Sequence, residues 1–417
     1  MTVRRMVNPV MTYAWGSRDA IANLQGRPAT GVAEAELWMG AHPQAPSELE
    51  DGSDRHGLGD GSSRHGLGDG SSKHGLGDGS NRQSLDAVIA ADPLGVLGAL
   101  CFERFGPRLP FLLKVLAAEH PLSLQVHPDD EQARRGFAAE EAAGIDRLAA
   151  DRNYRDPFGK PELLVALTDF HVLQGFRPAE EAAATLSALH VDGLSPLIEA
   201  LQGGTPTGEV FLRLIEWPAG DRARVVSEVA AACSTFAAGG VGPWIAGLAA
   251  NYPSDPGVIG VLLLNYLTLH PLEGLYVRPG QIHAYLHGTG IEVLGGSDNV
   301  IRGGLTPKHV SAVELRAILS VDAAPPALVA PVVSTEGGQT WPTPQPEFEV
   351  RRQQITAMER LAPGGPAVLL CLEGELEIGD RDGSVALGPG ESAFAFAGAD
   401  LAVAGSGVLV RARPGTG

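Results

Sequence analysis

Residues 278–292 read RPGQIHAYLHGTGIE and combine a Pro-Gly turn with a run suited to a β-strand. Other short β-rich runs, each set off by Gly or Pro, lie on both sides of this stretch. They cover residues 163–167, 260–269, 274–277 and 368–378. Many short strands separated by Gly and Pro favour jelly-roll barrels.

A helical pattern replaces the β-rich runs between residues 178 and 251, where the chain is rich in alanine. Glu180 and Glu181 follow Pro178 and suit the first turn of a helix. We expect a second helix after Asp221, where apolar residues recur at helical spacing. These residues are best explained as the packed core of a small helical domain.

The predicted fold class is mainly β with an α-helical domain, and it consists of two jelly-roll barrels plus an inserted helical domain. A chain of 417 residues exceeds the size at which a single core usually stops growing, so several domains are expected. We assign residues 1–177 and 252–328 to the first barrel, 178–251 to the helical domain, and 329–417 to the second barrel. The second barrel contains no histidine, and we expect Glu373, Glu375 and Glu377 to be solvated along one strand face.

The composition narrows the class of protein. The chain has 31 Lys and Arg against 49 Asp and Glu, which gives a net charge of −18 and disfavours nucleic acid and anionic membranes as partners. The most apolar segment is well short of the roughly 20 residues that a membrane span needs. Three widely spaced cysteines without a CxxC motif predict free buried thiols. We therefore expect a cytoplasmic protein and a monomer.

A nine-residue unit recurs three times within residues 51–81, as RHGLGDGSS twice and then KHGLGDGSN. Such glycine density leaves little apolar surface to bury, so we expect a flexible insertion. The G-x-G-D pattern resembles calcium-binding nonapeptide repeats only faintly, and weak metal capture by the recurring histidines is the other alternative.

Ligand-type side chains occur in several strand-like stretches. In LSLQVHPD, Gln125 and His127 are two residues apart, so their side chains leave the same face of a strand. Glu162 opens a strand after Lys-Pro, and His283 follows a Pro-Gly turn at the spacing typical of cupin metal motifs. Two imidazoles, a carboxylate and an amide oxygen suit Zn²⁺ with an open position for water or substrate.

Cations and hydroxyl groups bracket these stretches: Lys114, Lys160, Arg302, Lys308, Ser123 and Thr306. A phosphate dianion needs charge-assisted donors of this kind, and arginine can also clamp a developing enediolate. The sequence therefore predicts a phosphate-bearing ligand near the metal. The other histidines have no such partners in register and are assigned a structural role. They are His42, His120, His171, His190, His270, His287 and His309.

Five stretches together resemble the signatures of type I phosphomannose isomerases. They are YAWGSRDAI, ELWMGAHPQAPS, LLKVLAAEHPLSLQVHPD, GKPELLVAL and IHAYLHGTGIEVLGGSDNVIRGGLTPKHV, in this order from about Tyr13 to Val310. The resemblance covers most of the chain. Two features depart from the family pattern: the repeat enlarges a normally short connection, and Gly159 stands where a histidine commonly precedes Lys-Pro-Glu.

The resemblance implies a pair of cupin-like barrels and one Zn²⁺ held by Gln125, His127, Glu162 and His283. It also implies that Arg302 is catalytic. The residues implied to line the sugar-phosphate pocket are Lys114, Ser123, Lys160 and Lys308. The implied activity is the interconversion of mannose 6-phosphate and fructose 6-phosphate through a cis-enediol.

In this mechanism Zn²⁺ polarises substrate oxygens and Arg302 stabilises the charge that develops on them. Lys114, Lys160, Lys308 and Ser123 are expected to hold the phosphate. Glu292 and a zinc-bound water are the two candidate bases, and the sequence does not choose between them. Two other functions stay open. They are an isomerase of an unphosphorylated sugar or a different sugar phosphate, and a noncatalytic sugar-binding cupin used for regulation.

Overall fold

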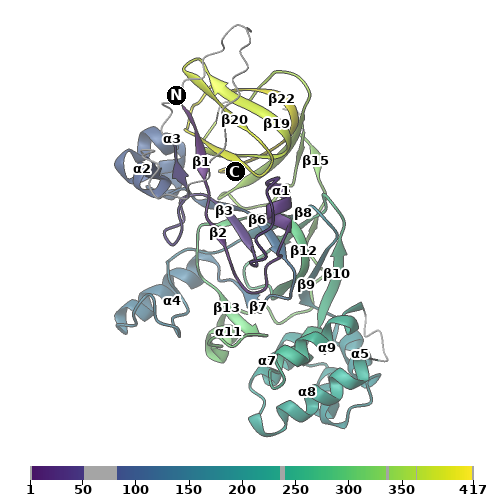
Figure 1. The fold of residues 1–417 in the computed structure, drawn as a ribbon. Helices are drawn as coiled ribbons and strands as arrows, with labels where there is room; N and C mark the ends of the chain where they lie inside the picture. Colours follow the sequence, from purple (N-terminus) through teal and green to yellow (C-terminus); the bar gives the residue numbers. More distant parts are fainter. Residues whose placement is uncertain (1, 51–81, 235–239, 335–337, 363, 416–417) are drawn as a thin grey trace.

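The structure is a computed structural model that describes residues 2–50, 82–234, 240–334, 338–362 and 364–415. Its strands form two antiparallel sheets, and a group of helices lies at one end of the molecule (Figure 1). The predicted flexible insertion at residues 51–81 falls outside the described residues.

The first sheet, here called the site sheet, has the order β14-β11-β8-β12-β6-β3-β2, with β7, β9, β10 and β13 attached beside β12. Its bounds are β2 Val10–Met11, β3 Glu36–Met39, β6 Phe111–Ala118, β7 Leu124–Val126, β8 Glu162–Ala166, β9 Phe170–Phe176, β10 Leu264–Leu269, β11 Gly274–Val277, β12 His283–Gly295, β13 Ile301–Gly304 and β14 Leu328–Val329. The long strand β12 pairs with β6 and β8 over its second half and with β7 and β9 over its first. This strand therefore connects the two parts of the sheet.

The second sheet, here called the C-terminal sheet, has the order β15-β16-β17-β22-β19-β21-β1-β4-β5, with β18 beside β22 and β20 beside β19. Its bounds are β1 Val3–Val7, β4 Glu48–Leu49, β5 Gln83–Ser84, β15 Val332–Val333, β16 Gln339–Thr340, β17 Glu349–Ile355, β18 Glu359–Arg360, β19 Ala367–Asp380, β20 Gly383–Leu387, β21 Ser392–Ala395 and β22 Ala402–Arg413. Strand β1 pairs with β21, so the first strand of the chain belongs to the C-terminal sheet. The predicted domain limits stay a prediction.

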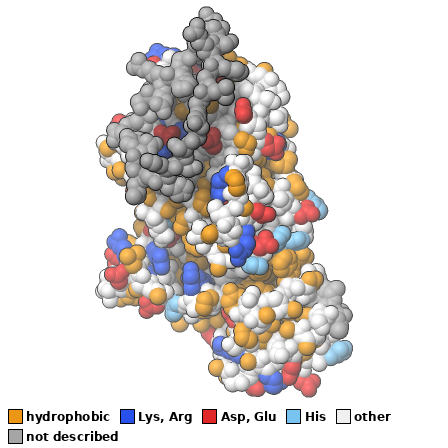
Figure 2. All heavy atoms as spheres, in the orientation of Figure 1, with side chains coloured by type: hydrophobic (Ala, Val, Ile, Leu, Met, Phe, Trp, Pro, Cys, Tyr) orange, Lys and Arg blue, Asp and Glu red, His pale blue; other side chains and the backbone are white. Residues whose placement is uncertain are grey.

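The helices form a cluster between β9 and β10 and several single elements elsewhere (Figure 1). The cluster comprises α5 Ala179–Ser187, η1 Asp192–Leu194, α6 Ser195–Gln202, α7 Thr207–Ile215, α8 Ala219–Cys233, α9 Gly242–Asn251, α10 Gly257–Gly260 and η3 Val261–Leu263. The others are α1 Ala20–Leu24, α2 Leu85–Ala91, α3 Pro93–Phe105, α4 Asp130–Ala142 and α11 Ala312–Ile318. On the face in Figure 2, Lys and Arg side chains lie interspersed with Asp and Glu around α4.

Two large groups of buried apolar side chains hold these parts together. One joins the helical cluster to the site sheet, where Phe211 of α7 packs against Phe176 of β9. The other joins the two sheets and includes Val293 of β12 and Phe394 of β21. Because burial of apolar area is the main stabilising term, the site sheet is supported on both sides by packed core.

Most of the predicted strands and helices are confirmed. The prediction at residues 260–269 is correct only from Leu264, because the preceding apolar residues form α10 and η3. A short apolar run does not distinguish a buried strand from a buried helix. Cys101, Cys233 and Cys371 are free and buried as predicted. Among the described residues, no single helix is long and apolar enough to span a membrane, and only the bent pair α2 and α3 passes that test, on length and composition alone.

Candidate metal centre and substrate pocket

Three neighbouring strands place three of the predicted site residues in one row. Gln125 of β7 lies directly opposite His283 of β12 on one side and opposite Arg302 of β13 on the other. Side chains that are directly opposite in antiparallel strands point to the same face. Strand pairing alone therefore brings the amide, the imidazole and the guanidinium to one face of the sheet.

The predicted metal ligands His127, Glu162 and His283 form a buried group whose ligand atoms all lie within 4.8 Å of one another. Nε2 of His127 lies 3.2 Å from Oε1 of Glu162, and Nε2 of His283 lies 3.4 Å from Oε2. Both imidazoles therefore face the same carboxylate. Among the described residues this is the one group of three or more such side chains with metal-binding spacing.

The orientation of both imidazoles is fixed by the backbone. Nδ1 of His127 lies 2.8 Å from the carbonyl oxygen of Asn299, and Nδ1 of His283 lies 3.2 Å from that of Gln281. When each Nδ1–H donates to a carbonyl, each Nε2 presents a lone pair to the group. Nε2 of His127 is buried and has no hydrogen-bond partner among the described residues. These donors fit a Zn²⁺ ion, which takes imidazole nitrogen and carboxylate oxygen ligands.

Burial also keeps His127 neutral. Desolvation lowers the pKa of His127 to about 4, against an opposing effect of Glu162. Burial raises the pKa of Glu162, but its electrostatic interactions with His127 and Lys160 outweigh burial and hold this pKa well below the ordinary value. Neutral imidazole and ionised carboxylate are the protonation states that bind a metal.

The loop that follows His127 is fixed by a helix cap. The Asp129 side chain accepts a hydrogen bond from the Gln132 backbone and closes a capping box at the start of α4. The backbone N–H of Gly159 donates to Oδ1 of Asp130 at 2.8 Å, and a Cβ atom at Gly159 would lie 3.0 Å from the Asp130 nitrogen. This tight contact shows that the backbone of residue 159 packs directly against the loop that carries His127.

Lys114 lies between two carboxylates beside the metal group. Its Nζ is 3.2 Å from Glu36 and 3.3 Å from Glu292, and it lies 5.1 Å from the ring centroid of Trp38. Although burial by itself lowers the pKa of Lys114, the two carboxylates raise it above the ordinary value. Burial raises the pKa of Glu292, with Lys114 opposing. A small cavity of about 50 Å³ connects these residues with Glu162 and His283.

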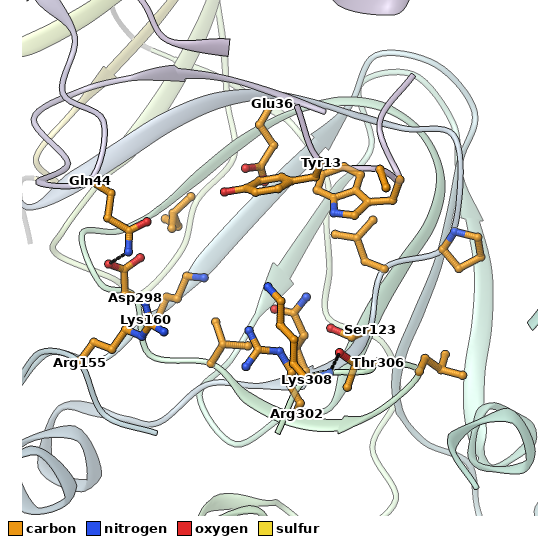
Figure 3. Close-up of a pocket in the computed structure, with 18 of the residues that line it drawn as sticks. Tyr13, Glu36, Gln44, Ser123, Arg155, Lys160, Asp298, Arg302, Thr306 and Lys308 are labelled. Carbon is orange, nitrogen blue, oxygen red and sulfur yellow. Dashed lines mark hydrogen bonds between the residues drawn. The ribbon is translucent and has the colours of Figure 1, made fainter. Parts of the chain in front are cut away.

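A larger cavity of about 720 Å³ adjoins this small one, and Lys114, Gln125 and Lys160 line both. Its lining includes every predicted substrate-binding residue: Lys114, Ser123, Lys160 and Lys308, together with Gln125 and Arg302. Figure 3 shows Arg302 and Lys308 side by side, with Ser123 and Thr306 on one side and Arg155 and Lys160 on the other. Lys160 is 3.3 Å from Oε1 of Glu162, so it lies at the edge of the metal group.

The cations at the outer part of this pocket repel one another. Burial and then the charge of Arg155 lower the pKa of Arg302, and burial followed by Arg302 and Arg155 lowers the pKa of Lys308. None of these three side chains forms an ion pair with a carboxylate in the described part of the chain. Asp298 lines the same pocket, and although burial raises its pKa, His42 and cations that include Arg155 lower it. Among the residues described, Arg302 and Lys308 keep unpaired charge that is suited to bind an anion.

Sequence reasoning missed several residues that line the site. Glu36 and Arg155 were missed because neither stands at a spacing from another ligand-type residue that indicates a metal site. Glu36 does open one of the recognised signature stretches. Asn299 is fully buried and fixes His127, and its place in SDNVIRGG was the available signal. His42 was assigned a structural role, yet it lines the pocket and its Nε2 is 3.2 Å from Oδ1 of Asp298. His120 also lines the pocket.

The fold and the site together define a mainly β protein in which a buried His/Glu/His group, able to hold a metal ion, lies next to a pocket lined with cations. Residues 70–179 match the family described as "Phosphomannose isomerase type I, catalytic domain". Mannose-6-phosphate isomerase of Escherichia coli K12 is 34% identical over 418 residues, covering 98% of this chain and 99% of that protein. The chain belongs to the type I phosphomannose isomerase family.

Relatives at greater distance and solved structures agree. Mannose-6-phosphate isomerase 1 of Arabidopsis thaliana is 28% identical and covers 99% of this chain and 94% of its own length. The structure of mannose 6-phosphate isomerase from Salmonella typhimurium bound to fructose 6-phosphate and zinc has a TM-score of 0.85 and 32% identity, and it covers all of both chains. A zinc-bound mannose 6-phosphate isomerase structure has a TM-score of 0.86 at 33% identity, again over all of both chains.

Proposed function

We propose that this chain interconverts D-mannose 6-phosphate and D-fructose 6-phosphate in a zinc-dependent reaction. The observation that carries the proposal is the buried His127/Glu162/His283 group next to the cation-lined pocket, to which it is linked by Lys160. The zinc-bound and substrate-bound relative of known structure supports the same substrate pair.

In this proposal Gln125, His127, Glu162 and His283 hold one Zn²⁺. Gln125 joins the group because it lies in register with His283 and lines the small cavity that contains Glu162. A bound zinc ion acts as a Lewis acid that polarises the oxygens of the sugar. Lys160 lies 3.3 Å from Glu162 and so partly balances the negative charge of this proposed zinc ligand.

The phosphate is best placed at the outer cations. Of the four residues expected to line the sugar-phosphate pocket, Lys114 and Lys160 are paired with carboxylates near the metal group. Ser123 and Lys308 lie with Thr306 in the outer part of the pocket (Figure 3). We therefore assign Ser123 and Lys308 to the phosphate, add Arg155, and assign Lys114 and Lys160 to the reacting end of the sugar. Binding energy at the phosphate then orients C1 and C2 for the reaction.

Glu292 is the proposed base that removes the proton from C2 and returns it to C1. It is buried, it is separate from the three-residue metal group, and Lys114 holds one of its oxygens at 3.3 Å. A carboxylate whose pKa is raised by burial accepts a proton more readily near neutral pH. Arg302 lies in register with Gln125 and is placed to stabilise negative charge on the substrate oxygens.

A substrate comparison tests the proposal. Purified zinc-loaded protein is assayed for ketose formation from mannose 6-phosphate, mannose and a second aldose 6-phosphate. We expect rapid conversion of mannose 6-phosphate and a kcat/KM at least about a hundredfold lower for mannose, because the phosphate contacts are lost. Equal turnover of mannose and its 6-phosphate would contradict the phosphate assignment. No turnover of any aldose would contradict the isomerase.

A further inference from the structure

A second cavity of about 500 Å³ lies next to the substrate pocket and takes no part in the proposed reaction. It is bounded by α2, by the loops before β6 and β8, and by the loop between β12 and β13. His42, Gln44, Leu112, Arg155 and Asp298 line both cavities. Its volume lies within the range of roughly 300 to 1,000 Å³ that is usual for small-molecule sites.

Most of the lining is apolar and includes flat aromatic side chains. Phe111, Phe158, Ile89 and Leu109 line the cavity, and Leu148 at its edge is 82% exposed. The guanidinium of Arg108 lies 3.7 Å from the ring centroid of Phe158. A stacked pair of guanidinium and phenyl ring offers a flat surface that suits an aromatic ligand.

The charged groups of this cavity leave two polar atoms unsatisfied. Oδ1 of Asp86 and Nε of Arg108 are buried without a hydrogen-bond partner among the described residues. Burial lowers the pKa of Arg108, and Glu347 is the largest of the nearby carboxylates that oppose it. No carboxylate in the described part of the chain comes within ion-pair distance of Arg108. Leaving a buried donor unpaired costs about 1–3 kcal/mol, so the Arg108 guanidinium has unused capacity to bind an anionic group that reaches it.

We propose that this second cavity binds a small aromatic anion, with its ring against Phe158 and its anionic group at Arg108. The carboxylate of Asp86 accepts a hydrogen bond from a hydroxyl or amino group where the ligand carries one. Three arginines line the cavity, and Arg147 is the one of them that pairs with a carboxylate, Glu141. Three aspartates also line it, and two of them are already held by donors of the chain: Asp156 by the Asp298 N–H and Asp298 by Gln44 and His42. The anionic group is therefore directed to Arg108, which has no ion pair among the described residues, rather than drawn by a net positive lining.

The shared wall couples this ligand to the substrate pocket. Gln44 donates to Asp298 at 2.9 Å and His42 lies 3.2 Å from the same carboxylate. Asp298 also donates its backbone N–H to Asp156, which lines the second cavity. A ligand that shifts these side chains changes the substrate pocket, and by thermodynamic linkage fructose 6-phosphate changes the affinity for the ligand by the same factor. Only this coupling rests on the proposed function.

Crystallography of the unmodified chain gives the first test. The zinc-loaded protein is soaked with 6-bromo-2-naphthoate, and the bromine is located by its anomalous scattering. We expect one bromine site among Phe111, Phe158 and Leu109, with the carboxylate within hydrogen-bond distance of Arg108. No bromine in this cavity at saturating ligand, or bromine only elsewhere, would overturn the proposal.

Calorimetry with matched variants gives the second test. Arg108→Met keeps most of the side-chain volume and removes the charge, and we expect it to weaken 2-naphthoate binding at least about tenfold. Arg104→Met is the control, because Arg104 also lies over a phenylalanine, at 5.5 Å from the Phe105 centroid, but does not line the cavity. Equal weakening by both variants would overturn the assignment of Arg108. Failure of the isomerase assay would leave both binding tests unaffected.

Discussion

The site sheet and the C-terminal sheet are each organised around one long strand. The polar side chains of the first strand are buried, and those of the second are exposed. Strand β12 has 13 residues and contains the buried polar side chains His283 and Glu292. Strand β19 has 14 residues, and its polar side chains Glu373, Glu375 and Glu377 are exposed. Similar strand architecture therefore does not create a site. The site depends on which face of the strand carries the polar residues.

The difference has an energetic reason. Burial of an ionised side chain is costly unless charges and hydrogen bonds compensate for it. In the site sheet, Lys114 is compensated by Glu36 and Glu292, and Glu162 faces two imidazoles. The buried positions of β19, such as Leu370 and Ile378, are apolar and need no such compensation. The charges buried in the site sheet are thus compensated by one another, whereas β19 buries no charged side chain.

The largest expected effect is a loss of zinc binding and activity when a glutamate of the site sheet, but not one of the C-terminal sheet, is replaced. Glu162→Gln removes the carboxylate that faces both imidazoles, and we expect zinc binding to be lost and kcat/KM to fall more than about a hundredfold. The matched variant Glu375→Gln alters an exposed carboxylate of β19 and should leave both within about twofold. Zinc content and turnover of mannose 6-phosphate are measured on both proteins. Similar losses in the two variants would remove the functional distinction between the sheets.

A smaller effect is expected at Arg302. Arg302→Lys keeps the positive charge but loses the planar fork, so we expect kcat to fall by about tenfold to a hundredfold while zinc content stays unchanged. Steady-state kinetics on zinc-loaded protein separate kcat from KM. A change in KM alone would assign Arg302 to substrate binding rather than to stabilisation of the reacting oxygens.

A core substitution in the C-terminal sheet should change the stability of the protein but not its activity per bound zinc. Ile378 is fully buried in a cluster that includes none of the proposed site residues. Ile378→Ala leaves a cavity and is expected to lower the free energy of unfolding by about 3 kcal/mol. Urea unfolding measures the loss, and kcat per bound zinc at 25 °C should be unchanged. A large fall in kcat per zinc would mean that the second sheet takes part in catalysis.

The smallest expected effect is a pH dependence that belongs to the site sheet. Burial, followed by His287, lowers the pKa of His171, whose ring lies against Trp244 of α9. Because the folded state binds this proton less readily than the unfolded state, His171 reduces stability as pH falls through about 6.5. His171→Gln should therefore lose less stability than the unmodified chain between pH 7.5 and 5.5. If the urea midpoint shifts by the same amount between these two pH values in both proteins, this assignment is contradicted.

The sequence signals for the predicted ligands are local, and His127, Glu162 and His283 do come together in the fold, while their binding of zinc stays a prediction. Gln125 lies in β7 and His127 directly follows the end of this strand, and Glu162 and His283 each open a strand. The β19–β20 hairpin was also predictable, since the turn residues between the two strands are explicit in the sequence. The Pro- and Ala-rich stretch at residues 322–333 supplies β14 to one sheet and β15 to the other.

The remaining parts depend on pairings between distant residues. Lys114 was expected to line the sugar-phosphate pocket, but its contacts with Glu36 and Glu292 arise only when β3, β6 and β12 pair. The pairing of β1 with β21 joins opposite ends of the chain and has no local signal. Arg155 reaches the pocket because Asn299 fixes its backbone at 2.7 Å. Tertiary contacts of this kind are set by the whole fold rather than by a local pattern.

Stepwise zinc reconstitution tests the central claim that the site sheet holds the catalytic metal. The protein is stripped of metal with a chelator, and bound zinc and turnover of mannose 6-phosphate are followed together as zinc is added. We predict no turnover without metal and a linear rise that ends at one zinc per chain, whereas His127→Ala shows neither tight binding nor turnover. Full turnover by the metal-free protein, or zinc-dependent turnover that survives in His127→Ala, would contradict the account.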